Sequence, residues 1–310
     1  MRCSSYITIL ALTALNVAIL AFSRAELLTS TLPMFVAQGI ILLVIFVTMR
    51  RLLNKTARAA ISLLRLHYAV EGLFFLHIAW LNLRLLNHLS MMLPFPYADT
   101  LLAGWDQALH LDWLSYFNAV LSLPQVFHVL DVAYTSLTLL SVVVLLLLVS
   151  CGYIARAREF IDTFFVTAMI CILVGAAFPA KAAVLTLIPD LSIFAQMGWI
   201  PGSYHIAYLE ELRDPSAPLV LNPANLPGLA TFPSFHTASG ILIISACRKT
   251  WLSAPAWIYA TVMISATPVL GGHYIVDLIA GVLVAVLVVT LLRRVNRESA
   301  PTAQLQHAVA

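Results

Sequence analysis

The chain contains 310 residues, of which 61% are hydrophobic and 10% are charged, and its formal net charge is +3. Soluble globular domains carry about 25% charged residues, so this composition excludes a soluble enzyme and a nucleic-acid-binding domain. It indicates a polytopic integral membrane protein with an all-α fold, a bundle of transmembrane helices. The net charge carries little information, because the placement of cations relative to the bilayer matters more than their sum.

Apolar runs in the first half of the chain predict three membrane spans and one interfacial segment. The spans are expected at Tyr6–Phe22, Pro33–Met49 and Leu66–Leu86. Residues Leu101–Leu123 are less apolar and mix acidic with aromatic side chains, which predicts an interfacial or re-entrant helix. The first run has the flanks of a weak signal peptide, but it is long for a signal core, so we favour a retained helix.

The second half is expected to hold five further spans, which brings the total to about eight. They are predicted at Gln125–Leu148, Phe160–Phe178, Ser234–Leu252, Pro255–Leu270 and Tyr274–Leu292. The longest polar interval, Pro179–Pro233, is rich in proline and glycine and predicts an extended loop. The tail over 298–310 is polar, lacks an apolar face and is expected to be disordered.

Lysine and arginine are distributed unevenly between the two sides of these spans. If the cationic stretch Arg50–Arg65 is cytoplasmic and the spans alternate, thirteen of the seventeen Lys and Arg residues fall inside. The outer side then holds only Arg24, Arg84, Lys181 and Arg213. This asymmetry predicts cytoplasmic termini and an outward-facing Pro179–Pro233 loop.

Two polar motifs lie at the N-terminal ends of the spans predicted at Ser234–Leu252 and Tyr274–Leu292, on the predicted outer side. They are Phe-Pro-Ser-Phe-His (232–236) and His-Tyr-Ile-Val-Asp-Leu (273–278). His273 and Asp277 are four residues apart and therefore share one face of a helix. A carboxylate in that position can hold one ring N–H and leave the other nitrogen free to attack. With His236 as a second histidine, the set suits phosphoryl transfer through a phosphohistidine.

The paired Pro-Ser-x-His and His-x-x-x-Asp motifs resemble those of the type-2 phosphatidic acid phosphatase superfamily. The residues within these motifs resemble most the branch that contains fungal inositol phosphorylceramide synthase and, more distantly, sphingomyelin synthase. The resemblance covers about Leu140 to Leu292. It implies a catalytic membrane domain with a six-helix core over 125–297, preceded by N-terminal transmembrane helices and the interfacial helix over 1–124.

The resemblance also implies a role for each motif residue. His273 would be the nucleophile, Asp277 would orient it, and His236 would be the general acid. Ser234 and backbone N–H groups at the start of its helix would bind phosphate oxygens, as a helix N-terminus favours. The expected partners are the lipid bilayer, a lipid phosphate or phospholipid substrate and, for a transferase, an alcohol acceptor; no cofactor, metal or nucleic acid is implied.

The rest of the superfamily pattern is incomplete in this sequence. The Ser-Arg pair expected before the second histidine is replaced by Ala266 and Thr267, so one phosphate-binding arginine is missing. The superfamily also has an upstream Lys-x6-Arg-Pro motif. Lys181 corresponds to its lysine, but no Arg-Pro pair follows. We expect Lys181 and Arg213, two cations of the outer loop, to bind substrate phosphate. His205 in the same loop is a further candidate for substrate contact.

Three alternatives remain open at the level of sequence. His205, His236, His273 and Asp277 could form a metal site, because the i,i+4 spacing suits a ligand pair. A transporter or channel is suggested by the many spans and two intramembrane acids, although no internal repeat of the kind found in transporters is visible. Hydrolysis and transfer also remain open for an enzyme, with the branch likeness favouring an alcohol acceptor.

Overall fold

The computed structural model describes the backbone of residues 3–55, 61–216 and 218–308, and the side chains of 4–54, 61–216 and 218–296. Four of the cations counted above, Arg2, Lys55, Arg58 and Arg297, lie outside the residues whose side chains are described. The side chain of Cys3 lies outside them as well.

Among the described residues, six helices are long and apolar enough to cross a membrane. They are α1 (Cys3–Phe22), α2 (Leu32–Lys55), α3 (Ile61–Met91), α8 (Ile154–Ala177), α12 (Ser253–Leu270) and α13 (Ile275–Ala308). A transmembrane helix needs about 20 mostly apolar residues, and the longest apolar runs of the sequence coincide with these helices. The predicted all-α, multi-pass membrane bundle is therefore confirmed.

The remaining expected spans are built differently. The run predicted at Gln125–Leu148 forms two helices, α6 (Pro124–Thr135) and α7 (Leu137–Ser150), which are bent by 60° and together count as a seventh span. The run expected at Ser234–Leu252 forms the shorter α11 (Phe235–Cys247). Its 13 residues extend about 20 Å, less than the roughly 30 Å of a bilayer core.

The segment expected as one interfacial helix is also divided, into α4 (Asp99–Ala108) and α5 (Trp113–Leu121). Between them His110 adopts a positive φ of 55°, and Asp112 caps α5 by accepting a hydrogen bond from the N–H of Ser115. An Asx cap at a new helix start explains why the chain breaks here.

The polar interval before α11 contains only short elements. They are α9 (Ala183–Leu187), the 3₁₀ helix η1 (Leu191–Phe194), α10 (Ile206–Arg213) and strand β2 (Leu219–Leu221). Strand β2 pairs in parallel with β1 (Ala25–Leu27), with Glu26 opposite Val220. This small sheet ties the loop to the chain that follows α1.

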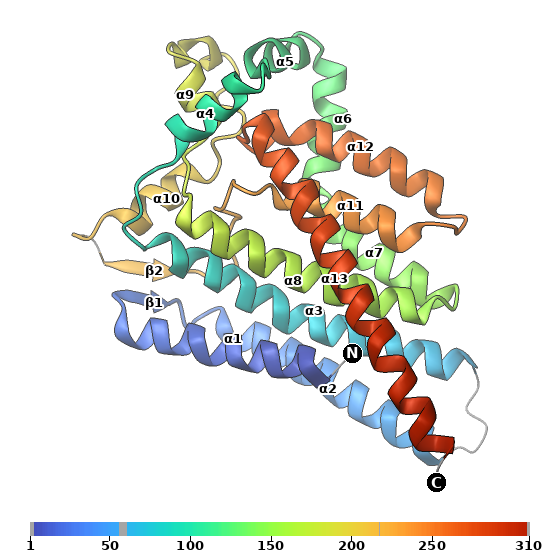
Figure 1. Ribbon diagram of the computed structural model, residues 1–310. Helices are drawn as coiled ribbons and strands as arrows, with labels where there is room; N and C mark the ends of the chain where they lie inside the picture. The colour runs from blue at the N-terminus through green and yellow to red at the C-terminus, as the bar shows by residue number, and fades with distance from the viewer. Residues whose placement is uncertain (1–2, 56–60, 217, 309–310) are drawn as a thin grey trace.

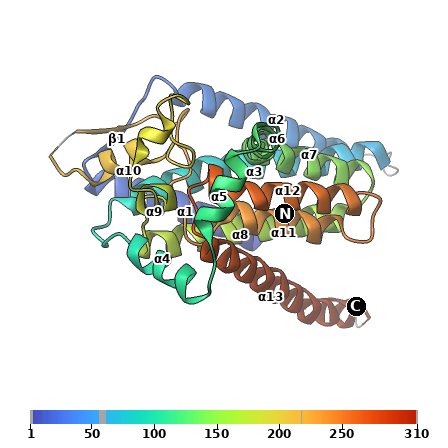
Figure 2. The same ribbon diagram turned by 90° about the horizontal axis from the view of Figure 1, so that it is seen from above.

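The short elements gather at one end of the bundle. Figure 1 shows α4, α5 and α9 at the top, whereas the α7–α8 and α11–α12 turns lie at the right and the C-terminus at the lower right. Seen from above, α2 and α13 occupy opposite sides of the bundle with α8, α11 and α12 between them (Figure 2). The most apolar window of α8 is 61% buried and that of α2 is 0% buried, so α8 is central and α2 peripheral.

Helix α13 extends through most of the tail that was expected to be disordered over 298–310, and the side chains of that segment lie outside the described residues. Within the bundle, the intramembrane Glu71 is 8% exposed and pairs with Arg158 at 3.5 Å. Its carboxylate thus has a cationic partner on a neighbouring helix.

Candidate active site

The N-terminal ends of α11 and α13 lie against each other and bring the two motifs together. The backbone N–H of Ser234 donates a hydrogen bond to the carbonyl of Asp277 at 3.0 Å. Gly281, one turn further along α13, permits this approach, because a Cβ atom there would lie 2.4 Å from the carbonyl oxygen of Ser234. A close helix crossing therefore sets the distance between the two motifs.

His273 lies in the turn between α12 and α13, with its ring held on both sides. Its Nδ1 is 3.2 Å from Oδ2 of Asp277, and its Nε2 is 3.4 Å from Oγ of Ser234. Because the buried carboxylate accepts the Nδ1–H, the lone pair is left on Nε2. Burial lowers the pKa of His273 to about 4, so the ring is neutral near pH 7 and suited to nucleophilic attack.

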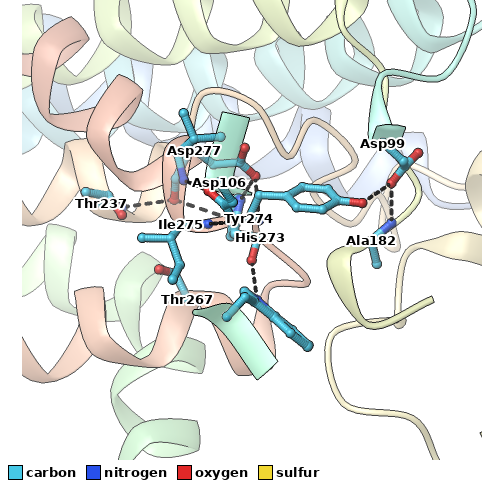
Figure 3. A network of polar contacts seen from close by, with 12 residues as sticks. Asp99, Asp106, Ala182, Thr237, Thr267, His273, Tyr274, Ile275 and Asp277 are labelled. Carbon is cyan, nitrogen blue, oxygen red and sulfur yellow. Dashed lines mark hydrogen bonds and ion pairs between the residues drawn. The ribbon is translucent and has the colours of Figure 1, made fainter. Parts of the chain in front are cut away.

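Side chains of the capping helices α4 and α5 fix the turn that carries His273 (Figure 3). Asp106, 3% exposed, accepts hydrogen bonds from the N–H of Ile275 at 2.9 Å and of Val276 at 2.7 Å. It therefore caps the positive N-terminal end of α13. The indole of Trp113 donates a hydrogen bond to the carbonyl of His273 at 2.9 Å.

A second carboxylate of α4, Asp99, connects this turn to the polar interval. It accepts hydrogen bonds from the hydroxyl of Tyr274 at 3.0 Å and from the N–H groups of Lys181 at 2.9 Å and Ala182 at 3.3 Å. The residue after His273 and the start of α9 are thus held by one buried side chain.

The second motif histidine, His236, lies in the first turn of α11. Its ring stacks on that of Tyr134, with centroids 3.9 Å apart and an angle of 13° between the planes. The hydroxyl of Tyr134 is 3.4 Å from that of Tyr204. The stack fixes the plane of the imidazole.

A cavity of about 910 Å³ adjoins the histidines. Its polar part is lined by Arg84, Asn87, Tyr134, Tyr204, His205, His236 and His273. Apolar side chains of α2, α3, α7 and α8 line the remainder, among them Leu42, Leu73, Val142, Phe165 and Ile172. Leu73 and Arg84 are eleven residues apart on one helix, so the cavity extends about 16 Å along α3.

The structure brings most of the predicted site residues together. His205, His236 and His273 line the cavity, and Ser234 and Asp277 lie directly behind His273. His205 is 1% exposed; its Nε2 donates to the carbonyl of Lys181 at 2.7 Å, and its Nδ1 has no hydrogen-bond partner among the described residues.

The two predicted phosphate-binding loop cations lie elsewhere. The amine of Lys181 is 3.1 Å from the carboxylate of Glu210 and 5.2 Å from the centre of the Tyr97 ring. The guanidinium of Arg213 lies over the same ring at 4.4 Å and donates to the carbonyl of Phe95. Neither side chain is among the residues that line the cavity.

The described residues include no cluster of three or more His, Cys, Asp or Glu side chains arranged to hold a metal ion. At the positions of the missing Ser-Arg pair, Ala266 is buried and the hydroxyl of Thr267 donates to the carbonyl of Ile264 at 2.7 Å. No cation reaches the histidines from that part of α12.

Several site residues were not identified from the sequence. Asp106 and Trp113 belong to the segment read only as interfacial, Asp99 lies just before that segment, and Arg84 was counted only as an outer cation. An ionisable residue inside an apolar span is a general signal of function, and it applied to Arg84. The partners of the two α4 carboxylates depend on tertiary contacts that no local pattern encodes.

Comparison with known proteins and protein families identifies the family of the chain. No curated protein and no solved structure is significantly similar to the sequence. The sequence profile of the PAP2 superfamily matches residues 100–291, which is more than half of the chain and includes both histidine motifs. The chain therefore belongs to the PAP2 superfamily.

Proposed function

We propose that the protein is an integral-membrane lipid phosphatase or phosphotransferase that forms a phosphohistidine on His273. The observation that carries this proposal is the arrangement of the ring: Asp277 occupies Nδ1, and Nε2 is directed toward Ser234 at the start of α11. A helix N-terminus stabilises a phosphate group, and a neutral imidazole held by a carboxylate is an activated nucleophile.

The reaction has two balanced half-reactions. Nε2 of His273 attacks phosphorus; the P–N bond forms while the bond from phosphorus to the leaving oxygen breaks, and protonated His236 gives its proton to that oxygen. The acceptor hydroxyl then returns a proton to His236 as its oxygen attacks the phosphohistidine. The P–N bond breaks and both histidines regain their starting states.

The cavity supports a lipid substrate. Its apolar lining by α2, α3, α7 and α8 lies at membrane depth, next to a polar part that contains both histidines. Its volume of about 910 Å³ falls near the upper end of the roughly 300–1,000 Å³ of ordinary ligand pockets. The likeness to the inositol phosphorylceramide synthase branch favours a phospholipid headgroup as the transferred group and a lipid alcohol as the acceptor.

The test is a panel of lipid phosphates and phospholipids, presented to the purified protein in vesicles with and without lipid alcohols. Free phosphate and new phospholipids are followed by chromatography. We expect turnover by the parent protein, more transfer than hydrolysis when an alcohol is present, and none by His273→Ala. A parent protein that is inactive on the whole panel, or equal activity in His273→Ala, would contradict the proposal.

The role of His236 has its own test. The nitrophenolate of a nitrophenyl phosphate is a good leaving group without a proton. A lipid alkoxide is a poor leaving group and needs a proton from a general acid. In His236→Ala the rate of phosphoenzyme formation should therefore fall roughly 10²–10⁴-fold with the lipid and much less with the aryl ester, whereas the second half-reaction is slowed with both. Equal losses in the rate of phosphoenzyme formation with both substrates would contradict a general-acid role.

We also propose that the end of the bundle that carries α4, α5 and the histidines faces the non-cytoplasmic side, with cytoplasmic termini. The support is the cation asymmetry: the described Arg156, Arg158, Arg248 and Lys249 lie at or next to the α7–α8 and α11–α12 turns. Positively charged short loops favour the cytoplasm.

A further inference from the structure

We propose that Arg84 on α3 is a phosphate-binding residue of this active site, recognising the anionic phosphate ester of the substrate. The inference rests on the proposed function. Arg84 lies outside the matched residues 100–291, so it would make the N-terminal helices part of the catalytic site.

The position of Arg84 is the first support. It lines the same cavity as His236 and His273, and it is the only Lys or Arg among the described lining residues. The one carboxylate in that lining, Asp131, forms no ion pair with it. The cavity therefore presents one fixed positive charge next to the histidines.

The lack of a carboxylate partner is the second support. Nη1 of Arg84 donates to the carbonyl of Leu226 at 2.5 Å, and the guanidinium lies 5.5 Å from the ring centre of Trp80. Two other arginines pair with carboxylates, Arg158 with Glu71 at 3.5 Å and Arg293 with Glu159 at 2.6 Å, whereas Arg84 forms no ion pair among the described residues. A half-buried charge at the membrane edge without a counter-ion is costly unless an anion binds there.

The chemistry of the group is the third support. A guanidinium is planar, always charged and able to bind two phosphate oxygens at once. Only one of its N–H groups is taken by Leu226, so further donors are available to a ligand. His236, Tyr134 and Tyr204 line the same polar part of the cavity. A phosphate bound by Arg84 would lie in the cavity that His273 also lines.

The competing explanation is structural: in it, Arg84 serves only to hold the loop at Leu226. The loop that contains Leu226 forms a second hydrogen bond to α3. One turn after Arg84, the amide oxygen of Asn87 accepts a hydrogen bond from the N–H of Leu229 at 3.1 Å. Replacing Asn87 loosens the loop without removing charge, which allows the two explanations to be separated.

The experiment compares Arg84→Gln, Arg84→Lys and Asn87→Ala with the parent protein. The control is Arg65→Gln, on the same helix but bound to the carbonyl of Ser150 at the opposite end. Each variant is measured for KM and kcat on a lipid phosphate, for inhibition by orthovanadate, and for Tm in detergent. Orthovanadate is an anionic phosphate mimic without a lipid chain, so it reports on the charge site alone.

Arg84→Gln should weaken orthovanadate inhibition and raise KM about 10–100-fold, the range for a lost charge-assisted hydrogen bond. Arg84→Lys should recover part of this loss, and Arg65→Gln should match the parent. Asn87→Ala should lower Tm while weakening inhibition far less. Inhibition unchanged in Arg84→Gln, or losses that follow Tm equally in Asn87→Ala, would overturn the inference.

This outcome is distinguishable from failure of the proposed function. If the parent protein shows His273-dependent turnover and Arg84→Gln behaves like it, only the assignment of Arg84 fails. If the parent shows no His273-dependent turnover, the proposed function fails first. Should Arg84→Gln not fold, Arg84→Ala assayed with added guanidinium salt replaces it, and the absence of any rescue would count against the inference.

Discussion

The hydroxyl of Tyr274 donates a hydrogen bond to Asp99 at 3.0 Å, and both side chains are buried. This contact joins α4 to the residue that follows the proposed nucleophile. The same carboxylate also holds two backbone N–H groups at the start of α9. Helix α4 therefore helps to position His273 through the contacts of Asp99.

Asp99→Ala should destabilise the protein more than Tyr274→Phe does. The tyrosine change removes one hydrogen bond and leaves the N–H groups of Lys181 and Ala182 bound to the carboxylate. Asp99→Ala leaves the two N–H groups and the hydroxyl of Tyr274 without this acceptor, at roughly 1–3 kcal/mol for each donor that stays buried. Thermal unfolding in detergent measures the difference, and a larger loss in Tyr274→Phe would contradict this contact map.

Gly281→Ala should lower both stability and activity. The added Cβ would lie 2.4 Å from the carbonyl oxygen of Ser234, and a backbone atom cannot move aside as a flexible side chain can. Overpacking of this kind costs about 1–3 kcal/mol and would separate Ser234 from His273.

The matched control is Gly104→Ala in α4, where a Cβ would meet no atom within 4 Å. This change should be neutral or stabilising by up to about 1 kcal/mol, because alanine favours a helix over glycine. Tm and turnover of both variants are compared in one experiment. Equal behaviour of the two alanines would show that the α11–α13 crossing is looser than described.

Stability should fall as pH falls, and His205 should contribute to the loss. Burial lowers the pKa of His205 from its ordinary value near 6.5 to about 4, so the unfolded chain takes up a proton in this window while the folded chain does not. The contribution is fully present above pH 6.5, is lost toward pH 4, and amounts to at most about 3 kcal/mol.

His205→Gln keeps an N–H for the carbonyl of Lys181 but cannot titrate. The drop in Tm between pH 7.5 and pH 4.5 should therefore be smaller in His205→Gln than in the parent protein. An identical or larger drop in the variant would show that this histidine is not held neutral by burial.

The orientation can be measured with thiol labelling. Ser216 is exposed in the loop between α10 and β2, and Cys151 is an exposed native cysteine at the α7–α8 turn. In intact cells an impermeant thiol reagent should label Ser216→Cys, and it should label Cys151 only after permeabilisation. The reverse pattern would invert the proposed orientation.

The local part of the site was predictable because a helix fixes its own geometry. An i,i+4 spacing is enough to place Asp277 beside His273, and a serine before an apolar run predicts the cap at Ser234. Membrane spans are equally local, since a bilayer demands about 20 apolar residues in sequence.

The non-local part could not be predicted in the same way. Lys181 seemed a phosphate ligand because it is a cation in the right loop, but its amine is paired with Glu210. The bend between α6 and α7 interrupts a continuous apolar run; it occurs at Ser136, whose hydroxyl lies 3.2 Å from that of Tyr259 on α12. Such partners come from other helices and become known only when the helices are packed.

The measurement that tests the central claim most directly is trapping of the phosphoenzyme. The protein is quenched in alkali after brief reaction with a phosphate-labelled substrate, and labelled peptides are mapped by mass spectrometry. We predict an acid-labile phosphoryl group on His273 in the parent protein. It should accumulate in His236→Ala with a nitrophenyl phosphate, because the second half-reaction lacks its base, and be absent in His273→Ala. A phosphoenzyme in His273→Ala, or full turnover by the parent protein without any label on His273, would contradict the mechanism.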